Sequence, residues 1–81
     1  MRRQQGQEEK LKRTLADILP EFGKWAREVR SFPREAAVEK LAELSRRSHG
    51  EAERMFEILE REGKIFKLPG GDDYLWRVSS G

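Results

Sequence analysis

This chain of 81 residues, 40% of them charged and 36% hydrophobic, is long enough for one small domain with a modest core. It has no cysteine and one histidine, which excludes disulfides, thiol catalysis and cysteine-based zinc sites. No apolar run approaches the roughly 20 residues of a membrane span, and no signal-peptide core follows the basic N-terminus. We therefore expect a cytoplasmic protein with no cofactor, no metal and no membrane partner.

The positive charge is unevenly distributed along the chain. Residues 1–13 carry five basic and two acidic side chains, a net charge of +3, so the remaining body is at −1 within the total of +2. The body therefore lacks the overall basic field that indicates a nucleic-acid partner. The basic tail could attract DNA weakly, or it could serve only as a flexible linker.

The first predicted element is a long helix that follows a disordered tail. Residues 1–7 are polar and have no apolar periodicity, which predicts disorder. From Glu8, apolar residues recur at spacings of three and four, as on one face of a helix. They are Leu11, Leu15, Ile18, Phe22, Trp25 and Val29. Pro20 removes a backbone donor in the middle, so we expect either one kinked helix or two shorter ones. The segment 31–33 ends this helix.

Two shorter helices are predicted next. The second runs from about Pro33 to Ser45, and the third follows a short turn at residues 45–47. Ser48 and Glu51 have the spacing of a capping box at the start of the third helix. Its expected buried stripe consists of Ala52, Met55, Phe56 and Leu59. Gly63 should stop this helix in a left-handed conformation, just after Glu62.

The C-terminal part has the pattern of a β-hairpin. The hydrophobic period changes to two over residues 64–68 and 74–78, with a turn at 69–73. A lone hairpin is only marginally stable in water, so this one must pack on the helices. The order predicts an α+β, mainly α, fold: a winged helix-turn-helix domain over residues 8–78, with a flexible end at 79–81.

Several segments resemble one known family. They are Phe32 to Val38, Gly50 to Leu59, Glu62 to Phe66, Pro69-Gly70, and Tyr74. Together they are similar to the C-terminal winged-helix domain of archaeal MCM replicative helicases, over about residues 15–78. The turn at 70–73 is longer and more acidic than in that family. The resemblance implies a nucleoid-associated regulatory tail of a hexameric ATPase, whose partners are replication proteins or the parent helicase ring. It also implies that the domain holds no ATP site, and no phosphate-binding Gly-x-x-x-x-Gly-Lys-Ser/Thr loop occurs in the sequence.

The third helix, which usually reads DNA in this fold, is acidic here. From residue 51 to residue 62 it carries five glutamates and two arginines, a net charge of −3. Carboxylates in a DNA groove would be repelled by phosphates, so we predict a surface for protein contact. The candidates are Glu53, Arg54, Glu57, Glu60 and Arg61. The alternative is a solvated face held by pairs such as Glu57–Arg61.

Two basic groups are candidates for contact with a DNA backbone. Arg46, Arg47 and His49 precede the third helix, where free amides could also receive a phosphate. The second group, on or beside the hairpin, consists of Lys64, Lys67 and Arg77. Asp72 and Asp73 at the hairpin tip oppose a close approach to DNA. For both groups the alternative is ordinary solvated charge.

Two further sets of residues are candidates for binding. A basic run late in the first helix and just after it could contact nucleic acid or an acidic partner, or be solvated; it consists of Lys24, Arg27, Arg30 and Arg34. Five aromatic residues could stack on single-stranded bases, although their spacing favours core packing. They are Phe22, Trp25, Phe56, Tyr74 and Trp76.

The functional prediction is a binding module and not an enzyme, because no catalytic constellation is recognisable. The first hypothesis is the regulatory or interaction domain of a replicative helicase, with protein contacts, at most weak binding to a duplex backbone and no small-molecule substrate. The alternative is a stand-alone winged-helix DNA-binding transcriptional regulator.

Overall fold

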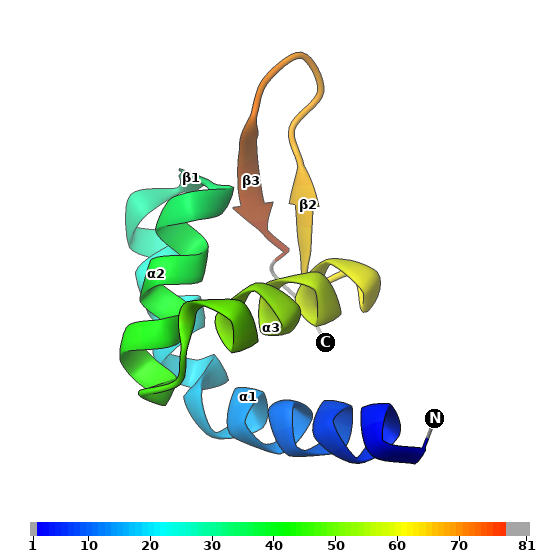
Figure 1. The fold of residues 1–81 in the computed structure, drawn as a ribbon. Coiled ribbons are helices and arrows are strands. Elements are labelled where there is room, and N and C mark those ends of the chain that lie inside the picture. The colour runs from blue at the N-terminus through cyan, green and yellow to red at the C-terminus, as the bar shows by residue number, and fades with distance from the viewer. Residues whose placement is uncertain (1, 78–81) are drawn as a thin grey trace.

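The computed structural model describes residues 2–77, with side chains for residues 8–77. The elements in chain order are α1 (Arg2–Val29), β1 (Ser31–Pro33), α2 (Arg34–Ser45), α3 (His49–Arg61), β2 (Ile65–Lys67) and β3 (Asp73–Trp76). The strands form one antiparallel sheet in the order β1-β3-β2. Figure 1 shows α2 and α3 as a crossed pair, with the hairpin β2–β3 rising beside them and the start of α1 running below α3. The prediction of a mainly helical α+β winged-helix fold is confirmed.

Helix α1 begins earlier than expected and is continuous through Pro20. It begins at Arg2, so the backbone is helical over residues 2–7, where we predicted a disordered tail. Besides Gly6, this segment consists of two arginines and three glutamines, and both residue types are good helix formers. Figure 1 shows α1 changing direction near its middle, and Pro20 lies inside the uninterrupted helix. The kink is therefore accommodated in one bent helix rather than in two short ones.

Strand β1 was not predicted. Arg30 adopts a left-handed conformation (φ 71°) that ends α1, and the next three residues pair with β3. Ser31 lies opposite Leu75 and Phe32 opposite Tyr74, and Phe32 is buried. Strand β1 thus attaches the hairpin to the junction between α1 and α2 and gives the sheet the third strand that a two-stranded hairpin lacks.

Both ends of α3 follow the prediction. The Ser48 hydroxyl accepts a hydrogen bond from the backbone N–H of Glu51 at 3.2 Å, as expected for an N-cap. At the other end, Gly63 has φ 78° and Lys64 N–H donates to the Leu59 carbonyl at 2.9 Å. This is the glycine-terminated helix end that the sequence indicated.

The core lies between the three helices and the inner face of the sheet. Phe22 contacts Phe32 and Trp76, with ring centroids 6.1 and 5.7 Å apart, while Phe56 packs edge-to-face on Tyr74 at 4.9 Å. Among the described residues the buried side chains are all hydrophobic. Three of the five aromatic candidates are therefore buried, and Trp25 and Trp76 are half-buried against the core.

One residue of the predicted apolar stripe of α1 lies elsewhere. Val29 is 42% exposed, because it is the last residue of α1, where the chain leaves the helix to enter β1. Within residues 2–77, no helix has the length and apolar character needed to cross a membrane.

Candidate functional site

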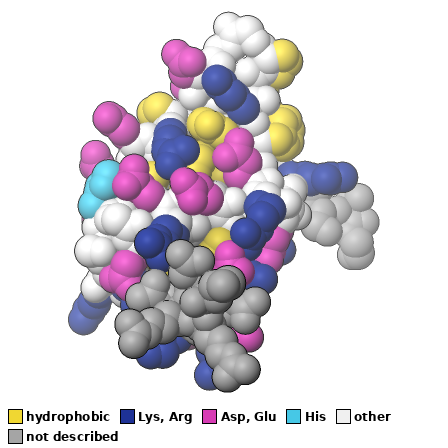
Figure 2. All heavy atoms as spheres, turned by 45° about the vertical axis from the view of Figure 1, so that its right-hand side comes forward, with side chains coloured by type: hydrophobic (Ala, Val, Ile, Leu, Met, Phe, Trp, Pro, Cys, Tyr) yellow, Lys and Arg dark blue, Asp and Glu magenta, His cyan; other side chains and the backbone are white. Residues whose placement is uncertain are grey.

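Helix α3 presents a charged outer face. Its buried side consists of Ala52, Met55, Phe56, Ile58 and Leu59. The opposite side carries the predicted protein-contact residues, which are half-buried or exposed: Glu53, Arg54, Glu57, Glu60 and Arg61. The face drawn in Figure 2 has acidic and basic side chains side by side, with apolar side chains next to them.

Arg61 and Glu57 of α3 pair with other elements, whereas His49 and Glu53 lie near each other along the helix. Arg61 Nη2 lies 2.6 Å from Glu8 Oε1 on α1, and Glu57 Oε2 lies 3.5 Å from Arg34 Nη2 on α2. These contacts take the place of the Glu57–Arg61 pair considered from the spacing. The hydrogen bond from Arg61 lowers the pKa of Glu8, which stays ionised and holds α1 to α3. Glu60 makes no ion pair with another side chain of residues 8–77.

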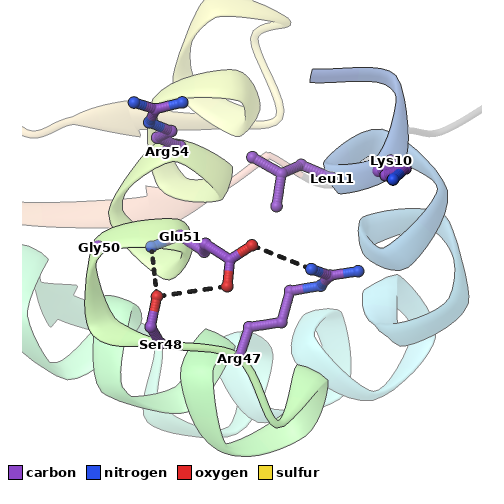
Figure 3. A pocket seen from close by; sticks show the side chains of 7 residues that line it. All are labelled: Lys10, Leu11, Arg47, Ser48, Gly50, Glu51 and Arg54. Carbon is purple, nitrogen blue, oxygen red and sulfur yellow. Dashed lines mark hydrogen bonds and ion pairs between the residues drawn. The ribbon is translucent and has the colours of Figure 1, made fainter. Parts of the chain in front are cut away.

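Arg47, a predicted DNA-backbone residue, joins α1 to the start of α3. Its Nε and Nη2 donate to Thr14 Oγ1 at 3.2 and 3.1 Å. Its Nη1 donates to Glu51 Oε2 at 3.0 Å, as Figure 3 shows. Its two predicted companions diverge from it. Arg46 is exposed in a left-handed conformation at the C-cap of α2, and His49 Nδ1 lies 3.9 Å from Glu53 Oε1.

A pocket of about 390 Å³ lies at the start of α3. Its lining combines three basic residues with the cap of the helix: Lys10, Leu11, Arg47, Ser48, Gly50, Glu51 and Arg54 (Figure 3). Lys10 was not among the predicted site residues, because only the packing of α1 against α3 brings it here.

The chain's own carboxylate occupies the positive end of α3. Glu51 lies between Ser48 and Arg47 in Figure 3. Burial acts to raise the pKa of Glu51, but hydrogen bonds from the Ser48 backbone and the Arg47 side chain oppose it, and the net shift is downward. A phosphate entering this pocket would therefore have to compete with an ionised carboxylate.

The basic residues of the hairpin lie near carboxylates. Lys64 Nζ is 4.0 Å from Glu62 Oε1, and Lys67 Nζ is 4.0 Å from Asp72 Oδ1. Arg77 is exposed at the base of the hairpin. Across residues 8–77, no ion pair or hydrogen bond joins this group to Arg46, Arg47 or His49, so the predicted DNA-backbone residues form two separate groups.

Two residues of the basic run Lys24, Arg27, Arg30 and Arg34 contact other parts of the chain. Arg27 Nε donates to the Gly23 carbonyl at 3.3 Å, and Arg34 reaches Glu57 on α3 and covers the Phe56 ring at 5.1 Å. The partner of Arg34 is therefore an acidic side chain of the chain itself.

One exposed aromatic residue was not considered as a candidate. Phe66 on β2 is 44% exposed, whereas its neighbour Ile65 is buried. Strand alternation alone could have indicated this, since adjacent residues of a strand face opposite sides. Among the described residues, no group of three or more histidine, aspartate or glutamate side chains is placed to hold a metal ion.

Comparison with protein-family models, with curated proteins and with solved structures gave no match. The resemblance of residues 15–78 to the MCM tail thus stays a prediction, and the function is argued from the residues themselves.

Proposed function

We propose that this chain is a non-catalytic winged-helix module that docks on a partner protein through the outer face of α3. The observation that carries the proposal is the solvent-facing position of acidic side chains on this helix: Glu57 and Glu60 are exposed and Glu53 is half-buried. In a major groove these carboxylates would lie close to phosphates, and the repulsion would oppose binding. A partner surface with basic residues would complement them.

The neighbouring basic side chains support the same conclusion. Arg34 and Arg61 are paired with carboxylates of this chain, and Arg47 is bound to Thr14 and Glu51. A phosphate that approached these arginines would compete with the contacts that they make within the chain. The cost of that competition weakens DNA binding further.

In its specific form, the module is the regulatory C-terminal domain of an MCM-type replicative helicase, acting at the nucleoid. Support for this form comes from the resemblance of the sequence together with the winged-helix order of the elements. The partner is then the parent helicase ring or another replication protein, and the chain performs no chemistry of its own.

A stand-alone DNA-binding regulator is the second candidate. The pocket at the start of α3 favours it, because Lys10, Arg47 and Arg54 meet there beside the helix N-terminus and Arg46 is exposed nearby.

A salt titration distinguishes the two candidates. The chain is titrated with duplex DNA between about 0.05 and 0.2 M salt, using several unrelated sequences. We expect dissociation constants no tighter than the non-specific range of about 10⁻⁴–10⁻⁶ M, with no preference among sequences. A sequence-selective complex at about 10⁻⁸ M or tighter would establish the regulator and end the docking proposal.

A further inference from the structure

Strand β2 leaves one main-chain edge open. In the part of the chain that the structure describes, it is the outer strand of the sheet and is hydrogen-bonded to β3 alone. Arg77 N–H donates to the Lys64 carbonyl and Leu68 N–H donates to the Asp73 carbonyl, at 2.7 and 2.9 Å. Hydrogen-bonded and non-hydrogen-bonded pairs alternate in an antiparallel ladder, so the main-chain groups of Ile65 and Lys67 point away from β3.

The exposed aromatic residue lies between these two open positions. Phe66 is 44% exposed and lies directly opposite the half-buried Leu75 on β3. Ile65 and Tyr74 are buried, which places the helices on the other face of the hairpin. The open hydrogen-bonding groups are thus arranged symmetrically about Phe66, one residue to each side.

The two ends of the hairpin carry opposite charge. Two cations, Lys64 and Arg77, lie at its base beside one carboxylate, Glu62. At the tip, Asp72 and Asp73 outweigh Lys67. An antiparallel copy of the same hairpin would bring a negative tip beside a positive base at both ends of the contact.

We propose that a second copy of this chain pairs antiparallel with β2 about a two-fold axis at Phe66. In this register Ile65 exchanges main-chain hydrogen bonds with the second copy's Lys67, and Phe66 faces its own counterpart in a non-hydrogen-bonded pair. Lys67 then lies opposite isoleucine and not opposite another lysine. The contact is isologous, as expected for a two-fold dimer.

The pairing is weak and reversible. A three-residue edge with one aromatic side chain buries less than the roughly 1,200 Å² at the lower limit of stable interfaces. We therefore expect a dissociation constant of about 10⁻⁴–10⁻³ M. The contact uses residues other than the outer face of α3 and does not depend on the proposed function.

A single-cysteine variant tests the register, because the natural sequence has no cysteine. In a non-hydrogen-bonded pair the Cβ atoms lie about 4.5 Å apart or slightly more, close enough for a disulfide. Phe66→Cys should therefore form disulfide-linked dimers under mild oxidation. The control is Asp72→Cys at the fully exposed tip, which in this register faces the base of the second copy and should cross-link far more slowly. Equal rates, or a faster Asp72→Cys, would overturn the proposal.

Sedimentation equilibrium tests the association without modification. The mean mass of the natural chain should rise toward that of a dimer as the concentration approaches about 1 mM, and Phe66→Asp should abolish the rise by placing like charges opposite each other. A chain that stays monomeric at this concentration contradicts the proposal. If an acidic peptide or single-stranded DNA then binds in a Phe66-dependent way, the edge belongs to that partner and the self-pairing is wrong. Lysine replacements at Glu53, Glu57 and Glu60 should leave the self-association unchanged. A failure of the β2 pairing proposal can therefore be distinguished from a failure of the α3 docking proposal.

Discussion

Phe22→Ala should lower the free energy of unfolding by about 3–5 kcal/mol. Phe22 is fully buried in α1 and contacts Trp25, Phe32 and Trp76, with ring centroids 5.5 to 6.1 Å away. These contacts join α1 to β1 and β3, so the cavity would open where helix and sheet meet. A domain of this size has only about 5–15 kcal/mol of stability, and most of it could be lost. Urea denaturation followed by circular dichroism measures the change.

The matched control is the same substitution at the exposed phenylalanine. Phe66→Ala should change the unfolding free energy by about 0.5 kcal/mol or less in dilute solution, because Phe66 is 44% exposed. Similar losses at both positions would contradict the assignment of the core to the face that Phe22 occupies.

Trp76→Ala should have the second-largest effect and lower the free energy of unfolding by about 2 kcal/mol or more. The loss should be smaller than for a fully buried tryptophan, because part of the Trp76 side chain is exposed. Trp76 is half-buried and lies against Phe22 and against Gly23 of α1, where an added Cβ would be 3.1 Å from Trp76 Cζ2. The side chain therefore fixes the hairpin to α1. Amide exchange should become faster in β2 and β3 than in α2.

A double-mutant cycle with Gly23→Ala tests this contact. Alanine in a helix interior is about 1 kcal/mol more favourable than glycine, so Gly23→Ala should stabilise the Trp76→Ala variant by that amount. In the natural chain the close approach of Trp76 should remove part or all of the gain. An equal effect in both backgrounds would mean that the two residues are not coupled.

The sequence was sufficient to predict the elements whose signals are local. The apolar spacing of α3 and the Ser48 cap lie within one helix and its flanking residues, and both appear in the structure as expected. The glycine stop at Gly63 is equally local, because a residue with positive φ at a helix end is usually glycine.

Features that depend on distant residues could not be predicted in this way. Strand β1 has only three residues and is stabilised by β3, some 40 positions later. The partner of Arg47 is Thr14, 33 residues away, and the partner of Arg61 is Glu8, 53 residues away. Charge spacing within a helix does not indicate such pairs, so the sequence marks Arg47 as a candidate for DNA contact or as solvated charge and does not indicate its place at the junction of α1 with α3.

The same distinction applies to the candidate site. The acidic character of α3 follows from composition, and its exposure follows from the helical period of the buried stripe. The contacts of Glu51 at the start of α3 can be predicted from the sequence only in part. The capping box indicates the contact with Ser48, while the contact with Arg47 depends on the geometry of the turn.

The most direct test of the central claim, that the carboxylates of α3 keep this module away from DNA, compares two charge reversals of equal size. One variant replaces Glu53, Glu57 and Glu60 with lysine. The other does the same at three exposed carboxylates of α1: Asp17, Glu21 and Glu28. We predict that the α3 variant binds duplex DNA at least about 10²-fold more tightly than the α1 variant at low salt. A plot of the logarithm of its binding constant against the logarithm of the salt concentration should also be steeper, by about 0.9 for each of two to three additional phosphate contacts. Equal affinities for the two variants, or weaker binding by the α3 variant, would contradict the account.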